Sequence, residues 1–232
     1  MKNKMDFDAV YKNSGYINDT DINEILRYMG CKTEKCDNDV FLLAHKAKKE
    51  VKEKIRPKAV WRYAKINSID CDTVDFGFLK LKSRALCKNL KGCRYVSFMV
   101  ATLGSEIDVV IKKYSVSSIT EAVAINAAGS AFIESYCDYI NDIITGSLKD
   151  EGYNTSSRFS PGYGDLNAEC QKDIFSYLDA QKHTGVYLTD SFMMMPSKSV
   201  CAIIGIGNTN KICINKCSLC DKSECEFRKG IK

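Results

Sequence analysis

Three stretches of the chain repeat their apolar residues at the spacing of an amphipathic helix. The first, DINEILRYMG at 21–30, starts with an aspartate that can cap it and ends with a glycine. The second runs over 38–56 and must stop before the proline that follows it. The third, over 118–148, starts with a capping box formed by Ser118 and Glu121. Small residues fill its first half (AVAINAAGSA), which lets a neighbouring element approach it closely.

Other stretches carry the β-branched and aromatic residues that strands favour. They are AVWRYAKI, TVDFGFL, RYVSFMVATLG, GVYLTDSFMMM and SVCAIIGIG. The third of these is almost continuously apolar, which predicts a buried central strand. Two shorter helices are expected over SEIDVVIKKYS and CQKDIFSYLDAQ. Because helices and strands do not alternate regularly, the pattern predicts an α+β fold, a single domain with a twisted antiparallel or mixed sheet packed with helices.

The polar ends of the chain set the expected domain limits. Residues 1–18 are polar and lack a period, which predicts an N-terminal arm. One globular domain is expected over 19–212, followed by a short cysteine-rich tail over 213–232. With 232 residues, 45% of them hydrophobic, the chain can bury a sizeable core.

Charge and hydropathy argue against two kinds of partner. The formal net charge is +5, from 34 Lys+Arg and 29 Asp+Glu, and the densest basic run, HKAKKEVKEKIRPK, is interleaved with glutamates. Such a run is typical of a solvated helix face, so nucleic-acid binding is not expected. The sequence shows neither an apolar stretch long enough to span a bilayer nor a secretory signal. We therefore expect a soluble, cytoplasmic protein without a membrane partner.

Four of the twelve cysteines crowd into the stretch CINKCSLCDKSEC. They are Cys213, Cys217, Cys220 and Cys225. A disulfide framework is not expected without an export signal. Thiolates spaced this closely favour a soft metal ion, so the tail is a candidate metal site. The spacing alone does not decide between zinc and an iron–sulfur cluster.

One of only three prolines stands in RFSPGYGD, residues 158–165, between two helical stretches. Proline fixes one backbone angle, and the glycines permit a close approach of the backbone to a ligand. Arg158 offers a planar fork suited to a carboxylate, and Tyr163 offers a flat ring and a hydroxyl. The loop therefore suits a ligand that has a carboxylate and a ring, although a turn that only connects two helices fits the same letters. As a loop residue, Arg158 is expected to matter little for stability.

A second stretch, HTGVYLTDSFMMMPSKSVCA, follows this loop after one helix. Together the two resemble the activation domain of cobalamin-dependent methionine synthase. In that family an Arg-x-x-Pro-Gly-Tyr loop precedes a stretch like Thr-Gly-x-x-Leu-Thr-(Glu/Asp)-Ser-x-x-Met-x-Pro-x-x-Ser-Val. The matching positions of the second stretch are Thr184, Gly185, Leu188, Thr189, Asp190, Ser191, Met194, Pro196, Ser199 and Val200. The resemblance covers roughly residues 118–207, with a looser match in hydrophobic pattern back to about residue 20.

The resemblance implies binding of S-adenosylmethionine. In the family, the domain closes over cobalamin whose cobalt has been oxidised to inactive Co(II). An external protein such as a flavodoxin or ferredoxin donates an electron, and S-adenosylmethionine supplies a methyl group. The sequence lacks an Asp-x-His-x-x-Gly stretch, so it resembles a free-standing activation domain. Its expected partner is the cobalamin-binding module of a separate methionine synthase or of a related corrinoid protein.

The resemblance also implies which residues contact S-adenosylmethionine. They are Arg158, Ser160, Gly162 and Tyr163 in the loop and Glu134 on the long helix. The ligand's carboxylate suits an arginine, and its ammonium and sulfonium suit a glutamate. Glu134 fits the exposed side of a long helix equally well.

Two parts of the family pattern are missing, and two other functions stay open. The family's early aspartate has only candidates here, namely Asp70, Asp72 and Asp75, and its aromatic contact after the last strand has no counterpart in GIGNTNK. One alternative function is a self-contained corrinoid reductase with an iron–sulfur cluster in the tail. The other is a zinc-knuckle binding module.

Overall fold

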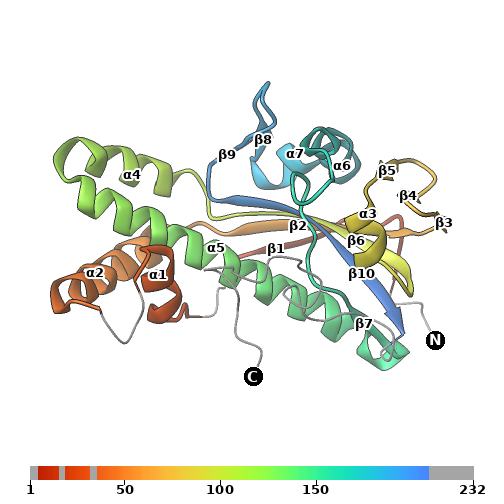
Figure 1. Ribbon diagram of the computed structural model, residues 1–232, viewed down its shortest axis with the longest axis horizontal. Coiled ribbons are helices and arrows are strands. Elements are labelled where there is room, and N and C mark those ends of the chain that lie inside the picture. The colour runs from red at the N-terminus through yellow and green to blue at the C-terminus, as the bar shows by residue number, and fades with distance from the viewer. Residues whose placement is uncertain (1–4, 16–18, 32–35, 209–232) are drawn as a thin grey trace.

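The main element of the fold is a curled antiparallel sheet of five strands (Figure 1). The computed structural model describes residues 5–15, 19–31 and 36–208. Along the sheet the order is β1 (Tyr11–Ser14), β2 (Lys58–Lys65), β6 (Cys93–Thr102), β10 (Ser199–Asn208) and β7 (Tyr153–Thr155). Every pairing is antiparallel. The predicted α+β class is confirmed, and of the two sheet types left open the structure shows the antiparallel one.

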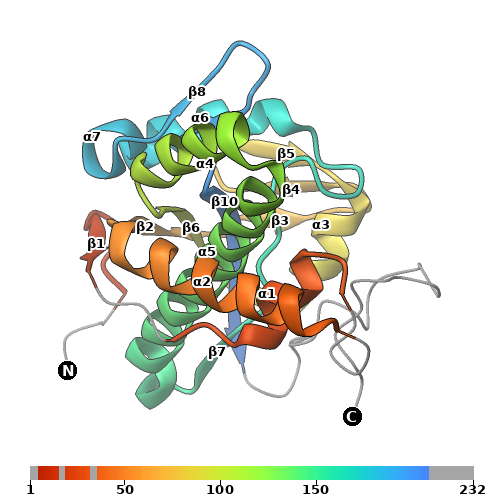
Figure 2. The same cartoon turned by 90° about the vertical axis from the view of Figure 1, so that its left-hand side faces the viewer.

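A 30-residue helix, α5 (Ile119–Leu148), lies along one face of the sheet (Figures 1 and 2). Three helices pack against it: α1 (Ile22–Tyr28), α2 (Asn38–Lys54) and α4 (Glu106–Ser117). Their apolar sides join those of α5 and of the sheet in one buried cluster. The helices predicted over 21–30, 38–56 and 118–148 are thus confirmed, with ends that differ by no more than a few residues.

A second buried cluster covers the other face of the sheet. Its helices are α3 (Arg84–Asn89), α6 (Gln171–Leu178) and α7 (Ala180–Thr184). Two small sheets join them, one of β3 (Ser68–Ile69), β4 (Thr73–Asp75) and β5 (Lys80–Lys82), the other of β8 (Tyr187–Leu188) and β9 (Met194–Met195). Short 3₁₀ turns, Lys149–Glu151 and Ala168–Cys170, follow α5 and precede α6.

The central strand β6 shows why its sequence is almost continuously apolar. Phe98 and Val100 point into the second cluster, whereas Met99 and Ala101 point into the first, and all four are fully buried. Because both faces of the strand are covered, alternation of polar and apolar residues is not needed. The predicted buried central strand is therefore confirmed.

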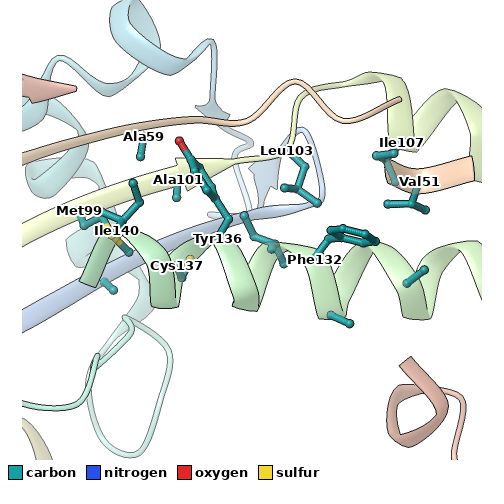
Figure 3. Packing of buried hydrophobic residues seen from close by; sticks show 14 of the residues in the cluster. Val51, Ala59, Met99, Ala101, Leu103, Ile107, Phe132, Tyr136, Cys137 and Ile140 are labelled. Atoms are coloured by element: carbon teal, nitrogen blue, oxygen red, sulfur yellow. The ribbon is translucent and has the colours of Figure 1, made fainter. Parts of the chain in front are cut away.

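Helix α5 is held to the sheet by large side chains along its middle (Figure 3). Phe132, Tyr136 and Ile140 are almost completely buried, and burial of a Phe or Ile side chain contributes roughly 1.5–3 kcal/mol to folding. The Tyr136 hydroxyl donates to Asn13 Oδ1 at 2.9 Å, which ties the helix to β1. Burial raises the pKa of Tyr136, so the hydroxyl stays protonated and remains a donor.

Three segments differ from their predicted form. Tyr11–Ser14, inside the expected N-terminal arm, pair with β2 as an edge strand. The stretch TVDFGFL forms only β4, because Gly77 turns the chain with φ +87°. The stretch GVYLTDSFMMM forms a hairpin whose strands are two residues each, and Phe192 at φ 60° lies in its turn. None of the helices in the described residues is long and apolar enough to cross a membrane.

Candidate functional site

The loop 158–165 is fastened to the sheet at its beginning. The Phe159 N–H donates to the Ile203 carbonyl at 2.9 Å, and the Ile203 N–H donates back to the Phe159 carbonyl at 2.8 Å. Phe159 is buried in the second cluster. The start of the loop therefore pairs with β10 beyond the end of β7. This pairing fixes the backbone next to Arg158.

Asp165 fastens the other end of the loop to helix α3. Its carboxylate accepts hydrogen bonds from the N–H groups of Arg84 at 2.8 Å and Ala85 at 3.2 Å, and from the Ser83 hydroxyl. These two N–H groups belong to the first turn of α3, which has no carbonyl partners for them within the helix. The Ser83 hydroxyl and the two N–H groups lower the pKa of Asp165, because they stabilise the carboxylate.

The backbone of the turn between these anchors requires glycine at both of its glycine positions. Gly162 and Gly164 have φ +84° and +61°, a region that L-residues with a side chain adopt at a cost. A Cβ at Gly164 would also lie 3.2 Å from Ala85 Cβ. The loop thus has a fixed backbone conformation. The sequence P-G-Y-G is required by this conformation and also forms part of the candidate site.

Arg158 is buried and paired with two carboxylates of α5. Its side chain is 7% exposed, its Nη2 lies 2.8 Å from Glu134 Oε2, and its Nη1 lies 2.6 Å from Asp138 Oδ1. Burial alone would lower the pKa of Arg158, but its neighbours Cys137, Asp138 and Glu134 outweigh burial and raise the pKa. A guanidinium held this way supports the packing of the loop on α5. Arg158 is therefore expected to contribute to stability, contrary to the expectation for an ordinary loop residue.

The structure brings together the two charged residues that the resemblance singles out, Arg158 and Glu134. Glu134 also lies near Tyr28 of α1, whose pKa is raised by burial and then by the charge of Glu134. Tyr163 is 57% exposed, and its ring meets Phe159 edge-on at 5.6 Å. Ser160 and Gly162 form the turn beside it.

A second cation, Lys198, lies against α5 and was missed in the sequence. Its ammonium donates to Asn126 Oδ1 at 2.8 Å and to Ser130 Oγ at 3.0 Å, and the residue is only 9% exposed. Burial lowers the pKa of Lys198, and the charge of Asp108 opposes that shift. A Cβ on Gly129 would come within 3.0 Å of Lys198 Cε, so the glycine makes room for the lysine stem. The run of small residues in α5 predicted that a neighbouring element lies close to the helix, but it did not identify Lys198 as the residue in contact.

The partners of the two cations form one row on α5, which we name the α5 stripe. It consists of Asn126, Ser130, Glu134 and Asp138. Residues four apart on a helix are neighbours along its axis, separated by a rise of about 6 Å. Lys198 occupies the first half of the stripe and Arg158 the second half.

Other predicted residues lie away from this row. Asp75 accepts from the Gly77 N–H and pairs with Lys80, and Asp72 pairs with Lys82, so both are engaged within the β3–β5 sheet. The four tail cysteines, Cys213, Cys217, Cys220 and Cys225, lie outside the described residues, and their metal site stays a prediction. Within residues 5–15, 19–31 and 36–208, no group of three or more histidines, cysteines or acidic residues could hold a metal ion.

The fold and this row of residues define a class of protein. It is an α+β domain in which an arginine on a loop beside the sheet forms ion pairs with carboxylates of a long helix. The chain belongs to the family of vitamin B12 dependent methionine synthase activation domains, whose model matches residues 91–213, more than half of the sequence. The matched part contains β6, α4, α5, the loop and β10. The resemblance seen in the two sequence stretches is confirmed.

A solved structure supports the fold over a longer part of the chain. It is a crystal structure of the MetH reactivation domain bound to AdoHcy, with a TM-score of 0.62 and 17% sequence identity. The match covers 85% of this chain and 78% of that one. The comparison with curated proteins finds no match.

Proposed function

We propose that this activation domain binds S-adenosylmethionine at the α5 stripe and the loop 158–165. In this role it reactivates a cobalamin-dependent methionine synthase or a related corrinoid protein. The observation that carries the proposal is the meeting of Arg158 with Glu134 inside a chain of this family. The similar MetH domain was crystallised with AdoHcy, the product that S-adenosylmethionine leaves after giving up its methyl group.

The residues present suit such a ligand. S-adenosylmethionine carries a carboxylate, an ammonium, a sulfonium and an adenine ring. The stripe offers carboxylates at Glu134 and Asp138 for the positive groups. The two cations that contact the stripe, Arg158 and Lys198, suit the negative group. The half-exposed ring of Tyr163 and the backbone of Ser160 and Gly162 offer a flat face and hydrogen-bonding groups for the adenine.

The chemistry requires a partner and an electron. Cobalamin, held by the partner, would supply the cobalt that accepts the methyl group of the sulfonium once an external donor has reduced it by one electron. S-adenosylhomocysteine would be left on the domain. The domain's own residues bind and orient the methyl donor so that its sulfonium faces the partner. We propose that the cobalamin is carried by a separate protein, and that a flavodoxin or ferredoxin supplies the electron.

Calorimetry tests the binding step. The protein is titrated with S-adenosylmethionine and with S-adenosylhomocysteine, alone and after mixing with a separately purified cobalamin-binding module. Saturable binding of both in at least one of these settings is expected. Absence of binding in both settings overturns the proposal. Recovery of methylcobalamin absorbance, with an electron donor present, tests the reactivation itself.

The two other functions depend on the cysteine tail, which lies outside the described residues. A corrinoid reductase requires a cluster, seen as a broad sulfur-to-iron absorbance band after anaerobic purification. A zinc-knuckle module that binds nucleic acid requires binding that falls steeply with salt. None of the described residues favours either function over the first.

A further inference from the structure

The charges along the α5 stripe are not balanced evenly. In its second half, one guanidinium, that of Arg158, faces two carboxylates, those of Glu134 and Asp138. In its first half, the ammonium of Lys198 has only the neutral partners Asn126 and Ser130 among the described residues. The stripe therefore has a net negative end and a net positive end about one helical turn apart.

The lysine's charge is the less well compensated of the two cations. A buried charge is unfavourable unless a charged partner stabilises it. Asp108, whose charge acts on Lys198, accepts instead from the Ser197 N–H at 2.8 Å and from the Ser197 hydroxyl. An ammonium has three donor hydrogens, and within the described part of the chain two of them have partners. An incoming carboxylate would supply both the missing charge and the third acceptor.

The side chain of Lys198 is also held in a fixed position by its packing against α5. Gly129 stands inside the first half of α5, where glycine destabilises a helix by about 1 kcal/mol relative to alanine. It has no positive φ to explain its presence, but its missing Cβ leaves room for Lys198 Cε and for Ile107 Cγ2. The stem of Lys198 thus passes over α5 at Gly129, and its ammonium lies between Asn126 and Ser130.

We propose that Lys198 receives the carboxylate of the bound amino-acid group, while Glu134 and Asp138 face its ammonium and sulfonium. The two charged groups of an α-amino acid sit on one carbon, which matches the single-turn step from Ser130 to Glu134. Arg158, whose fork is filled by the two carboxylates, then holds Glu134 in position at the site. This inference rests on the proposed binding of S-adenosylmethionine.

A comparison of two ligands on two variants tests it. Lys198→Met keeps the length of the stem and removes the charge. S-adenosylmethionine is compared with its carboxyl methyl ester, which lacks the negative charge. Lys198→Met is expected to weaken binding of the acid roughly ten- to a hundredfold and to leave binding of the ester unchanged. Lys112→Met, an exposed lysine on α4, is the matched control and is expected to bind both as the wild type does.

A second variant separates position from charge. Gly129→Ala keeps the lysine but pushes its stem, and it is expected to weaken binding of the acid more than that of the ester. Gly146→Ala, on the same helix with open space around it, is the control. Normal binding of the acid to Lys198→Met, or an equal loss for the ester, overturns the inference and leaves the proposed function intact. If the wild type binds no S-adenosylmethionine at all, the proposed function fails with it.

Discussion

The guanidinium of Arg158 lies 2.8 Å from the carboxylate of Glu134, although 24 positions separate the two residues. The family resemblance assigns both of them to one ligand, and the structure shows that they also hold each other. On the proposed function, a zwitterionic ligand would join this ion pair or replace part of it. Asp138, 2.6 Å from the other end of the fork, keeps the guanidinium in place in either case.

Arg158→Ala is predicted to weaken S-adenosylmethionine binding by about 1.5–3 kcal/mol, a roughly ten- to hundredfold loss. The substitution leaves Glu134 without its charged partner and frees the loop from α5. Because the arginine side chain is only 7% exposed, stability should also fall, by about 1–2 kcal/mol. Calorimetry and urea denaturation measure the two effects. Arg158→Lys should recover only part of the binding, since an ammonium does not span both carboxylates. Unchanged binding with a lowered Tm would make Arg158 purely structural.

Asp165→Ala is predicted to lower the free energy of unfolding by about 1–2 kcal/mol, because it removes the acceptor at the start of α3. Asp142→Ala, an exposed aspartate on α5, is the control and should change it little. The pKa of Asp165 is lowered from its ordinary 3.8, so its contribution is present above that value and is lost as the pH falls through the folded-state pKa. The difference between wild type and variant should thus be full at neutral pH and shrink as the pH falls below 3.8. A difference that stays constant with pH would mean that the carboxylate charge plays no part.

Gly164→Ala is predicted to destabilise the protein more than Gly162→Ala. Both place a side chain at positive φ, which costs about 1–2 kcal/mol. At Gly164 the new Cβ also crowds Ala85 at 3.2 Å, whereas at Gly162 its nearest neighbour is 3.6 Å away. Gly146→Ala in α5 should instead stabilise the protein, by up to about 1 kcal/mol. Thermal and urea denaturation rank the three, and any other order would contradict this account of the loop.

Joint replacement of Cys217 and Cys220 by serine is predicted to remove bound metal from the protein. Two of four thiolate ligands would be lost, and serine is a poor ligand for zinc or iron. Elemental analysis after anaerobic purification identifies and counts the metal. Cys71→Ser, an exposed cysteine of the described part, should leave the metal content unchanged. Wild-type protein without stoichiometric metal would show that the tail cysteines are not a metal site.

The sequence predicts those parts of the fold that depend on local pattern. Ser118 and Glu121 mark the start of α5 because a cap is a contact within one turn, and the Ser118 Oγ does accept from the Glu121 N–H at 3.4 Å. β1 could not be foreseen, since Tyr11–Ser14 become a strand only by pairing with β2. Lys198 escaped notice for a similar reason: its partners Asn126 and Ser130 are 72 and 68 positions away. The local sequence MPSKSV does not indicate that its lysine contacts α5.

Because one continuous helix carries Asn126, Ser130, Glu134 and Asp138, their spacing is set by the backbone hydrogen bonds of α5. Insertion or deletion of one residue between Gly129 and Glu134 would turn everything beyond it by about 100°. The later half of the stripe would then leave Arg158, while Phe132, Tyr136 and Ile140 would lose their register with the sheet. Evolution can therefore retune this site by exchanging residues but not by changing the length of the helix. Relatives that keep the site should align without gaps across this segment.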